Sequence, residues 1–231
     1  FRPIPSGKVS IKKAIILAIT ILLLSLFIAF QINFELGIII VLYLLIQISY
    51  CLALKKVPLI DIFCISTGFL LRSVAGGVST NLPISPWFLL TVGLLALFLA
   101  LEKRKAELRN SIEAGFITRK VLQRYSLPLL LRLESIVATS SFISYSLWAS
   151  GPSLNGAKTS WMLLTVPFVL LGIFRYQFIS DPEEFKRMKK INALRTSENP
   201  EEILIRDKGI KLIIFSWLLT TLSIGIIYGR S

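Results

Sequence analysis

The sequence predicts an all-α integral membrane fold, a single bundle of transmembrane helices. Three features predict it: 54% of the 231 residues are hydrophobic, only 17% are charged, and the apolar residues lie in long runs. A helix crosses a bilayer with about 20 apolar residues, so the apolar residues are sufficient for about six or seven such helices. Little is left for a soluble core, and a water-soluble globular domain is therefore excluded.

Seven apolar runs are predicted to span the membrane, in one polytopic domain that covers residues 1–231. In chain order, the predicted spans are about 14–31, 37–54, 59–79, 85–102, 127–149, 160–178 and 211–228. Six of these runs are clear from their length and composition. The fifth contains Arg132 and Glu134, which point in different directions on a helix because they are two residues apart. Each of them therefore needs a partner elsewhere in the bundle.

The third run differs from the others because it contains Asp61 and Arg72 together with several small residues. Such a helix is expected to face protein rather than lipid, since charges inside a membrane line a cavity or pair with a partner. Asp61 and Arg72 share one helix face, with the arginine about 16 Å deeper. Two explanations remain open: a polar substrate cavity, or a structural ion pair with Glu134 or with a segment outside this sequence.

Basic residues gather on one side of the predicted bundle. Of the 26 lysines and arginines, 21 lie before the first span, at 55–56, in the 103–126 loop or around the loop before the last span. Loops rich in lysine and arginine stay in the cytoplasm, so the first residue is expected inside and the C-terminus outside. The predicted location is the cell (plasma or inner) membrane, with the active side facing the cytoplasm.

The sequence lacks residue types that several kinds of catalytic site require. The sequence contains no histidine, which excludes histidine acid–base pairs, Ser-His-Asp triads and the common zinc sites that contain histidine. Cys51 and Cys64 lie in apolar stretches, which is typical of buried cysteines rather than of disulfides or metal clusters. Any metal ion is therefore expected to be held by oxygen atoms.

A group of cations at the cytoplasmic side is a candidate phosphate site. Lys103 and Arg104 follow the fourth span, and Glu107 lies one helical turn beyond them if the helix continues. Three further cations are expected at the same mouth: Arg2, Lys55 and Lys56. Such a cluster suits phosphate or pyrophosphate, although basic side chains also extend from membrane helices to the water without any further role. The sequence has no phosphate-binding glycine loop.

Several ordered motifs resemble one known family. Residues 2–7, RPIPSG, resemble the RPIxSG segment that follows the aspartate-rich NDxxDxxxD loop of the UbiA-type intramembrane prenyltransferases. Residues 49–77, the KRKAEL segment at 103–108 and the PEEILIRD segment at 200–207 are similar to one branch of that superfamily, the decaprenyl-phosphate phosphoribosyltransferases. The matches extend from the first residue to about residue 208.

The resemblance implies a UbiA-type bundle of nine spans, of which seven are present. The first two spans and the aspartate-rich loop are then expected upstream of Phe1. Since that loop binds Mg²⁺ in the family, Mg²⁺ is the expected cofactor, and its ligands within this sequence are unknown. This sequence alone is expected to be inactive.

The resemblance also implies a reaction. A 5-phosphoribosyl group passes from phosphoribosyl diphosphate to a polyprenyl (decaprenyl) phosphate, pyrophosphate is released, and the product enters cell envelope biosynthesis. Asp61, Lys103, Arg104 and Glu107 are the predicted catalytic residues, with Arg2, Lys55, Lys56 and Arg72 predicted to bind substrate. Lys103 and Arg104 would bind donor phosphates, Glu107 would orient them, and Asp61 would hold a ribose hydroxyl or Arg72. Membrane lipid is a further expected partner and nucleic acid is not; a homo-oligomer is compatible with this fold.

Two alternatives are weighed against this function. A UbiA-type prenyltransferase acting on an aromatic or other acceptor would carry a second pair of acids in the 103–126 loop, which contains no aspartate. A non-enzymatic membrane carrier would have charged residues along a path through the membrane. The intramembrane charges are few, which favours a one-sided site.

Overall fold

The computed structural model describes residues 10–115, 120–181, 205 and 207–228. Arg2 with its RPIPSG segment and most of the 200–207 motif lie outside these ranges. Within them the regular structure is helical, without any strand. The predicted all-α membrane fold is thus confirmed.

The longer elements are α-helices separated by short turns. They are α1 (Ile11–Ile32), α2 (Phe34–Leu52), α3 (Ile60–Thr80), α4 (Pro86–Ala114), α5 (Leu127–Ala149), α6 (Val166–Ser180) and α9 (Lys208–Tyr228). Four short 3₁₀ helices connect them: η1 (Leu54–Lys56), η2 (Lys120–Arg124), η3 (Pro152–Leu154) and η4 (Ser160–Thr165). Counting η4 and α6 as one segment, seven helices in the described ranges are long and apolar enough to cross a membrane.

Two helices differ from their predicted spans, and the difference in α4 affects the site. The fourth span was predicted to end at residue 102, but α4 continues to Ala114 and ends at Gly115, whose φ of 74° suits a glycine C-cap. The KRKAEL segment is therefore helical and not part of a loop. The sixth span begins with the 3₁₀ helix η4, because Pro167 lacks an N–H group and fits the first turn of α6.

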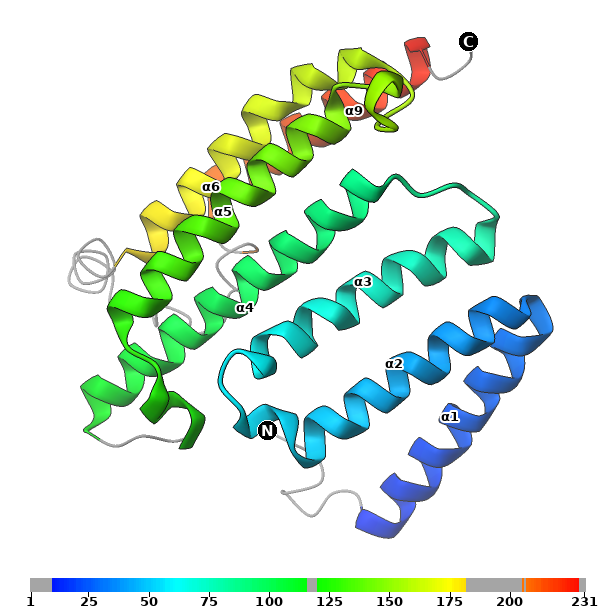
Figure 1. Ribbon diagram of the computed structural model, residues 1–231, viewed down its shortest axis with the longest axis vertical. Helices are drawn as coiled ribbons and strands as arrows, with labels where there is room; N and C mark the ends of the chain where they lie inside the picture. The colour runs from blue at the N-terminus through cyan, green and yellow to red at the C-terminus, as the bar shows by residue number, and fades with distance from the viewer. Residues whose placement is uncertain (1–9, 116–119, 182–204, 206, 229–231) are drawn as a thin grey trace.

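The helices follow one another across the bundle (Figure 1). Helices α1 to α4 lie side by side in chain order, α5 packs against α4, and α6 packs against both α5 and α9. The buried core lies between α3, α4, α5, α6 and α9 and includes Ile62, Phe98, Leu101, Leu130, Tyr176 and Ile210. By contrast, the apolar side chains of α1 point mostly outward, as expected for a helix in lipid.

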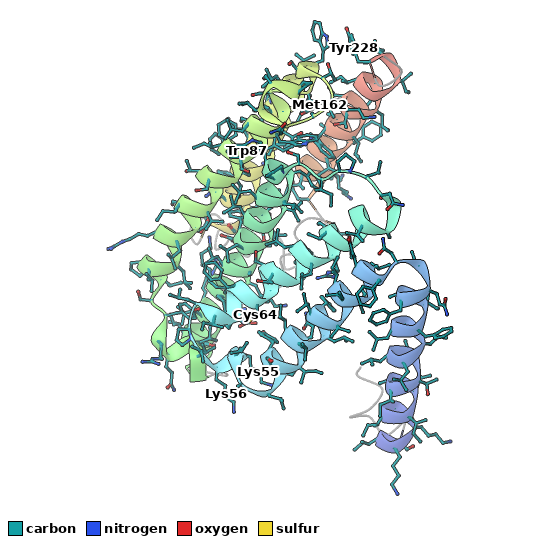
Figure 2. All side chains as sticks on the ribbon, turned by 45° about the vertical axis from the view of Figure 1, so that its right-hand side comes forward. Lys55, Lys56, Cys64, Trp87, Met162 and Tyr228 are labelled. Carbon is teal, nitrogen blue, oxygen red and sulfur yellow. The ribbon has the colours of Figure 1, made fainter. Side chains whose placement is uncertain are left out.

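The two ends of the bundle carry different residues (Figure 2). Lys55 and Lys56 lie at one end, and Trp87, Met162 and Tyr228 lie at the other. At the aromatic end, the Nε1 of Trp87 donates a hydrogen bond of 2.9 Å to the carbonyl oxygen of Leu154. Tryptophan and tyrosine collect at membrane–water interfaces, which suits these residues at the aromatic end. The buried ion pairs of Asp61, Arg104 and Glu107 lie at the basic end.

Candidate active site

Arg104, near the basic end of α4, is almost completely buried, with 1% of its side chain exposed. Its Nε donates a hydrogen bond of 2.7 Å to Oδ2 of Asp61, and its Nη1 donates one of 2.5 Å to Oε2 of Glu107. Nη2 lies 3.5 Å from the hydroxyl of Tyr50. A charge that leaves water needs such partners, and here two carboxylates compensate one guanidinium.

Asp61 lies in the first turn of α3 and has no exposed surface. Its other oxygen, Oδ1, accepts a hydrogen bond of 2.7 Å from the hydroxyl of Tyr125. The position favours a carboxylate because the N-terminus of a helix carries a partial positive charge. Asp61 thus joins α3 to α4 through Arg104, and to the end of η2 through Tyr125.

Tyr125 follows η2 directly and is buried in the core. Its hydroxyl also accepts a hydrogen bond of 2.6 Å from the backbone N–H of Leu59. Burial raises the pKa of Tyr125; the Leu59 N–H opposes this, whereas the hydrogen bond to Asp61 raises the pKa further. The hydroxyl therefore stays protonated and acts as the donor to Asp61.

Lys103 is the cation of the KRKAEL segment that remains accessible. Its side chain is half-buried, and no carboxylate pairs with it among the residues that the structure describes. The expected neighbour, Glu107, is bonded to Arg104 instead. Lys55 and Lys56 are exposed on η1, which packs against η2, where Arg124 is also exposed. Cations from η1 and η2 therefore gather beside the buried network of Asp61 and Arg104.

Arg72 lies in the middle of α3, away from this network. Its Nε donates a hydrogen bond of 3.1 Å to the carbonyl oxygen of Gly68, and its guanidinium lies 4.4 Å from the centre of the Phe69 ring. The expected contact between Asp61 and Arg72 is not formed, because Asp61 is bonded to Arg104 and Tyr125. The sequence pattern places Asp61 and Arg72 on one helix. It does not show that Arg104, on a different helix, is the partner of Asp61.

A second buried network lies on another side of α4. The Nζ of Lys105 is 2.5 Å from Oε1 of Glu102 and 2.6 Å from Oε2 of Glu134 on α5. Gln177 on α6 donates a hydrogen bond of 3.1 Å to Glu134. The partner that Glu134 requires is thus Lys105, and the alternative of an ion pair between Glu134 and the α3 stripe is wrong. Arg104 and Lys105, adjacent in sequence, tie α4 to α3 and to α5 and α6.

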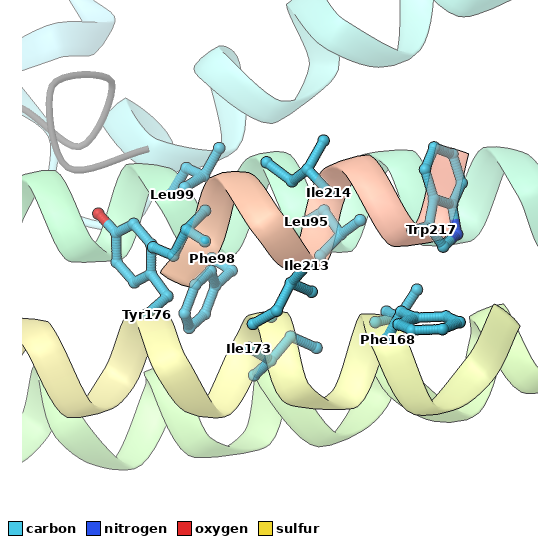
Figure 3. Close-up of a pocket in the computed structure, with 12 residues that line it drawn as sticks. Leu95, Phe98, Leu99, Phe168, Ile173, Tyr176, Ile213, Ile214 and Trp217 are labelled. Atoms are coloured by element: carbon cyan, nitrogen blue, oxygen red, sulfur yellow. The ribbon is translucent and has the colours of Figure 1, made fainter. Parts of the chain in front are cut away.

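An apolar groove of about 260 Å³ lies between α4, α6 and α9 (Figure 3). Its lining includes Phe98, Leu99, Gly172, Ile173, Ile213 and Trp217. On α4, Lys103 follows Leu99 by four residues, which places its side chain one helical turn beyond the groove, towards the basic end. A lipid chain in this groove would therefore have a cation near one end of it.

A metal ion needs several ligands around one point, which the described residues do not offer. They contain no group of three or more aspartate, glutamate, cysteine or histidine residues that would hold an ion. Asp61 and Glu107 are both engaged with Arg104, and Glu102 and Glu134 with Lys105. These carboxylates therefore do not fit a Mg²⁺ site by themselves.

Residues 1–195 match the model of the UbiA prenyltransferase family. The chain is 32% identical over 228 residues to the decaprenyl-phosphate phosphoribosyltransferase of Mycolicibacterium smegmatis, covering 95% of this chain and 68% of that protein. It is 30% identical over 222 residues to the protein of that name from Corynebacterium glutamicum, covering 94% and 63%. A shorter match, 35% over 80 residues, is to the digeranylgeranylglyceryl phosphate synthase of Methanosphaera stadtmanae, covering 35% and 29%.

These matches agree with the resemblance found in the motifs. They extend over nearly the whole chain, including the segments that carry Asp61 and Arg104. The chain belongs to the UbiA prenyltransferase family, in the branch of the decaprenyl-phosphate phosphoribosyltransferases.

Proposed function

We propose that this protein transfers a 5-phosphoribosyl group from phosphoribosyl diphosphate to a polyprenyl phosphate and releases pyrophosphate. The observation that carries the proposal is the helical KRKAEL segment, in which the half-buried Lys103 is next to Arg104, and Arg104 binds Asp61 at the start of α3, just after the exposed Lys55 and Lys56. The names of the relatives that match 94% or more of the chain agree with it. A donor with a diphosphate and a further phosphate needs several cations.

The proposed roles of the site residues follow from their surroundings. Lys103, Lys55 and Lys56 bind donor phosphates, since the three are exposed or half-buried. Arg104 holds Glu107, whose side chain is 21% exposed and is placed to orient the donor. Asp61 fixes Arg104 from the other side.

Arg72 and Arg2 are also proposed to bind substrate, although no contact in the described ranges places either of them beside Lys103, Lys55 or Lys56. Arg72 is available for a substrate phosphate because, among the described residues, no carboxylate pairs with it. For Arg2, which lies outside the described ranges, the RPIPSG motif alone supports this role. Both belong to the proposal as further cations for a substrate with several phosphate groups.

The apolar groove is the proposed seat of the acceptor's lipid chain. Its walls are almost entirely apolar, as an isoprenoid chain requires, and Lys103 lies one turn beyond Leu99. The acceptor phosphate would then lie near Lys103, at the boundary between groove and cations. The site would face the cytoplasm from within the membrane.

The reaction needs positioning and charge stabilisation more than a protein nucleophile. A phosphate oxygen of the lipid attacks the anomeric carbon of the ribose, and the bond to pyrophosphate breaks with its electron pair on the leaving group. Holding both substrates in line and stabilising the negative charge on pyrophosphate are tasks that lysine side chains can perform. The family resemblance assigns Mg²⁺ to the NDxxDxxxD loop, and the described carboxylates do not fit the ion.

One observation favours a second candidate function. The match to a digeranylgeranylglyceryl phosphate synthase covers 35% of the chain, and the name of that enzyme implies a prenyl transfer. A prenyl diphosphate has fewer phosphate groups than phosphoribosyl diphosphate and a long apolar chain. This candidate differs from the first in the donor, while the fold and the apolar groove stay the same.

An assay of the complete gene product in detergent distinguishes the two functions. The protein receives Mg²⁺ with either labelled phosphoribosyl diphosphate and a short polyprenyl phosphate, or a labelled prenyl diphosphate and an aromatic acceptor. Label from phosphoribosyl diphosphate should enter the organic phase, and chelation of Mg²⁺ with EDTA should stop the transfer. Turnover of the prenyl diphosphate alone would keep the fold and contradict the proposed donor.

A further inference from the structure

The hydroxyl of Tyr125 lies between two chain segments that carry the proposed donor-binding cations. It accepts a hydrogen bond of 2.6 Å from the Leu59 N–H and donates one of 2.7 Å to Oδ1 of Asp61. Leu59 ends the turn that contains Lys55 and Lys56, and Asp61 holds Arg104 on α4. One oxygen atom therefore connects the η1 turn with the KRKAEL helix end.

The backbone at Leu59 explains why this contact is needed. Leu59 has φ of 69°, a left-handed conformation that residues other than glycine rarely adopt, and it precedes the first turn of α3. A strained residue keeps such a conformation only when its surroundings hold it. The hydrogen bond from the Leu59 N–H to Tyr125 is one contact that holds the turn against η2.

The same hydroxyl sets how Asp61 holds Arg104. With Oδ1 occupied by Tyr125, Asp61 offers Oδ2 to the Nε of Arg104, and Nη1 remains for Glu107. Without the Tyr125 hydroxyl, Oδ1 would be a buried acceptor with no donor. Asp61 would then turn both oxygens to Arg104, in the paired geometry that arginine and carboxylate prefer, and draw the guanidinium away from Glu107.

We propose that Tyr125 is a positioning residue, which sets the cations of the η1 turn and the KRKAEL helix at the spacing that phosphoribosyl diphosphate requires. It contacts neither substrate and acts through Asp61 and Leu59. This inference rests on the proposed function. It adds a residue that lies outside the KRKAEL motif and that the sequence did not single out.

Steady-state kinetics of Tyr125→Phe test the inference in the complete gene product. The ring still fills its place in the core, and only the hydroxyl is lost. The KM for phosphoribosyl diphosphate should rise by about tenfold, because donor binding must then restore the arrangement that the hydroxyl held, at about the free energy of one hydrogen bond to a charged group. The kcat and the KM for polyprenyl phosphate should change by less than about twofold, because the lost interaction serves donor binding.

Tyr145→Phe is the matched control. Tyr145 is also buried, and its hydroxyl makes two hydrogen bonds, with Thr165 at 2.6 Å and Trp217 at 2.8 Å. It lies on α5 in the half of the bundle that holds Trp148, far along the helix from the cations. The donor KM should therefore stay at the wild-type value in this variant.

A double variant tests the route through Asp61. If Tyr125 acts through this carboxylate, Tyr125→Phe should raise the donor KM much less in an Asp61→Asn background than in the wild type. Fully additive effects would contradict the route. As a measurement that needs no variant, hydrogen exchange of the peptide around Leu59 should slow when phosphoribosyl diphosphate is added, and unchanged exchange would contradict the inference.

The outcomes separate the inference from the function on which it rests. A wild-type protein that transfers no phosphoribosyl group contradicts the proposed function. An active wild type whose donor KM is unchanged by Tyr125→Phe, or changed equally by Tyr145→Phe, contradicts the positioning role alone.

Discussion

The Nε of Arg104 donates a hydrogen bond of 2.7 Å to Oδ2 of Asp61, and both side chains are almost fully buried. Arg104 and Asp61 are 43 residues apart in the sequence, and their contact joins the basic ends of α4 and α3. Glu107 is the second partner of Arg104, so two carboxylates already neutralise the guanidinium and it is not available to a substrate. Lys103, its neighbour, is therefore the residue of the pair that is suited to bind phosphate.

Replacing Arg104 with alanine is expected to destabilise the protein strongly. The change leaves the buried carboxylate of Asp61 without its cation, and breaking a buried ion pair from one side costs about 3–5 kcal/mol. Lys103→Ala is the control, since it breaks no described ion pair. Thermal unfolding in detergent measures both. Equal stability of the two variants would show that the buried pair does not hold α3 and α4 together.

The network of Lys105 gives a second stability prediction. Lys105→Met leaves Glu102 and Glu134 buried together without their cation, so the melting temperature should fall clearly below the wild-type value. Adding Glu102→Gln and Glu134→Gln removes both unpaired charges and should restore much of the loss. A triple variant no more stable than Lys105→Met would indicate that packing of the lysine, rather than its charge, is what matters.

The groove gives a prediction about the acceptor. A Cβ atom at Gly172 would lie 3.7 Å from Cγ2 of Ile213, an ordinary contact, so a leucine at this position would extend into the groove. Gly172→Leu should raise the KM for polyprenyl phosphate by about tenfold. The leucine would displace roughly two methylene groups of the lipid chain from the groove, and each buried methylene group contributes about 0.8 kcal/mol to binding. The KM for the donor should not change.

Gly225→Leu is the control for this variant. Gly225 lies on α9, and no atom is within 4 Å of the position that a Cβ would take. Both changes place a leucine on a helix, but only one lies in the groove. An acceptor KM that rises equally in both variants would contradict the assignment of the groove to the lipid chain.

Asp207 gives a prediction about pH. Its carboxylate caps α9 by accepting a hydrogen bond of 2.7 Å from the Ile210 N–H, and it pairs with Arg175 at 3.0 Å. Burial alone would raise the pKa of Asp207, but the hydrogen bonds from Arg175 and Ile210 outweigh it and hold the pKa below its ordinary value.

The sign of the effect follows from this lowered pKa. Stability from the ionised form is fully present above the unfolded pKa of about 3.9 and is lost as the pH falls through the lower folded value. Because Arg175 is 41% exposed, the pair contributes about 1 kcal/mol or less. Asp207→Asn should therefore lower the melting temperature slightly at pH 7 and make no difference well below pH 4, measured by thermal unfolding. A constant difference at every pH would contradict it.

The fold was predictable because its signal is local. Each of the seven apolar runs is continuous in sequence, and each overlaps one of the seven long apolar helices, with ends that differ by a few residues in most cases. The end of α4 was harder to predict, since residues 103–114 are mostly polar and contain no apolar run. That helix is stabilised by contacts such as those of Arg104 and Lys105, which come from other parts of the chain.

The candidate site was predictable in its residue types but not in its contacts. The sequence singled out Asp61, Lys103, Arg104 and Glu107, and their catalytic roles stay predictions. It did not single out Tyr125, because no helical or strand spacing relates residue 125 to residues 59, 61 or 104. The partner of Glu134 was open for the same reason, since Lys105 is 29 residues away. Such contacts depend on which helices pack together.

Equilibrium binding of labelled phosphoribosyl diphosphate to the complete gene product, in detergent with Mg²⁺, tests the central claim most directly. The wild type should bind this donor, and Lys103→Ala should bind it about tenfold more weakly, as expected for the loss of a charge-assisted hydrogen bond. Unlabelled pyrophosphate should compete. Undiminished binding by Lys103→Ala, or a wild type that binds a prenyl diphosphate but not phosphoribosyl diphosphate, would contradict the account.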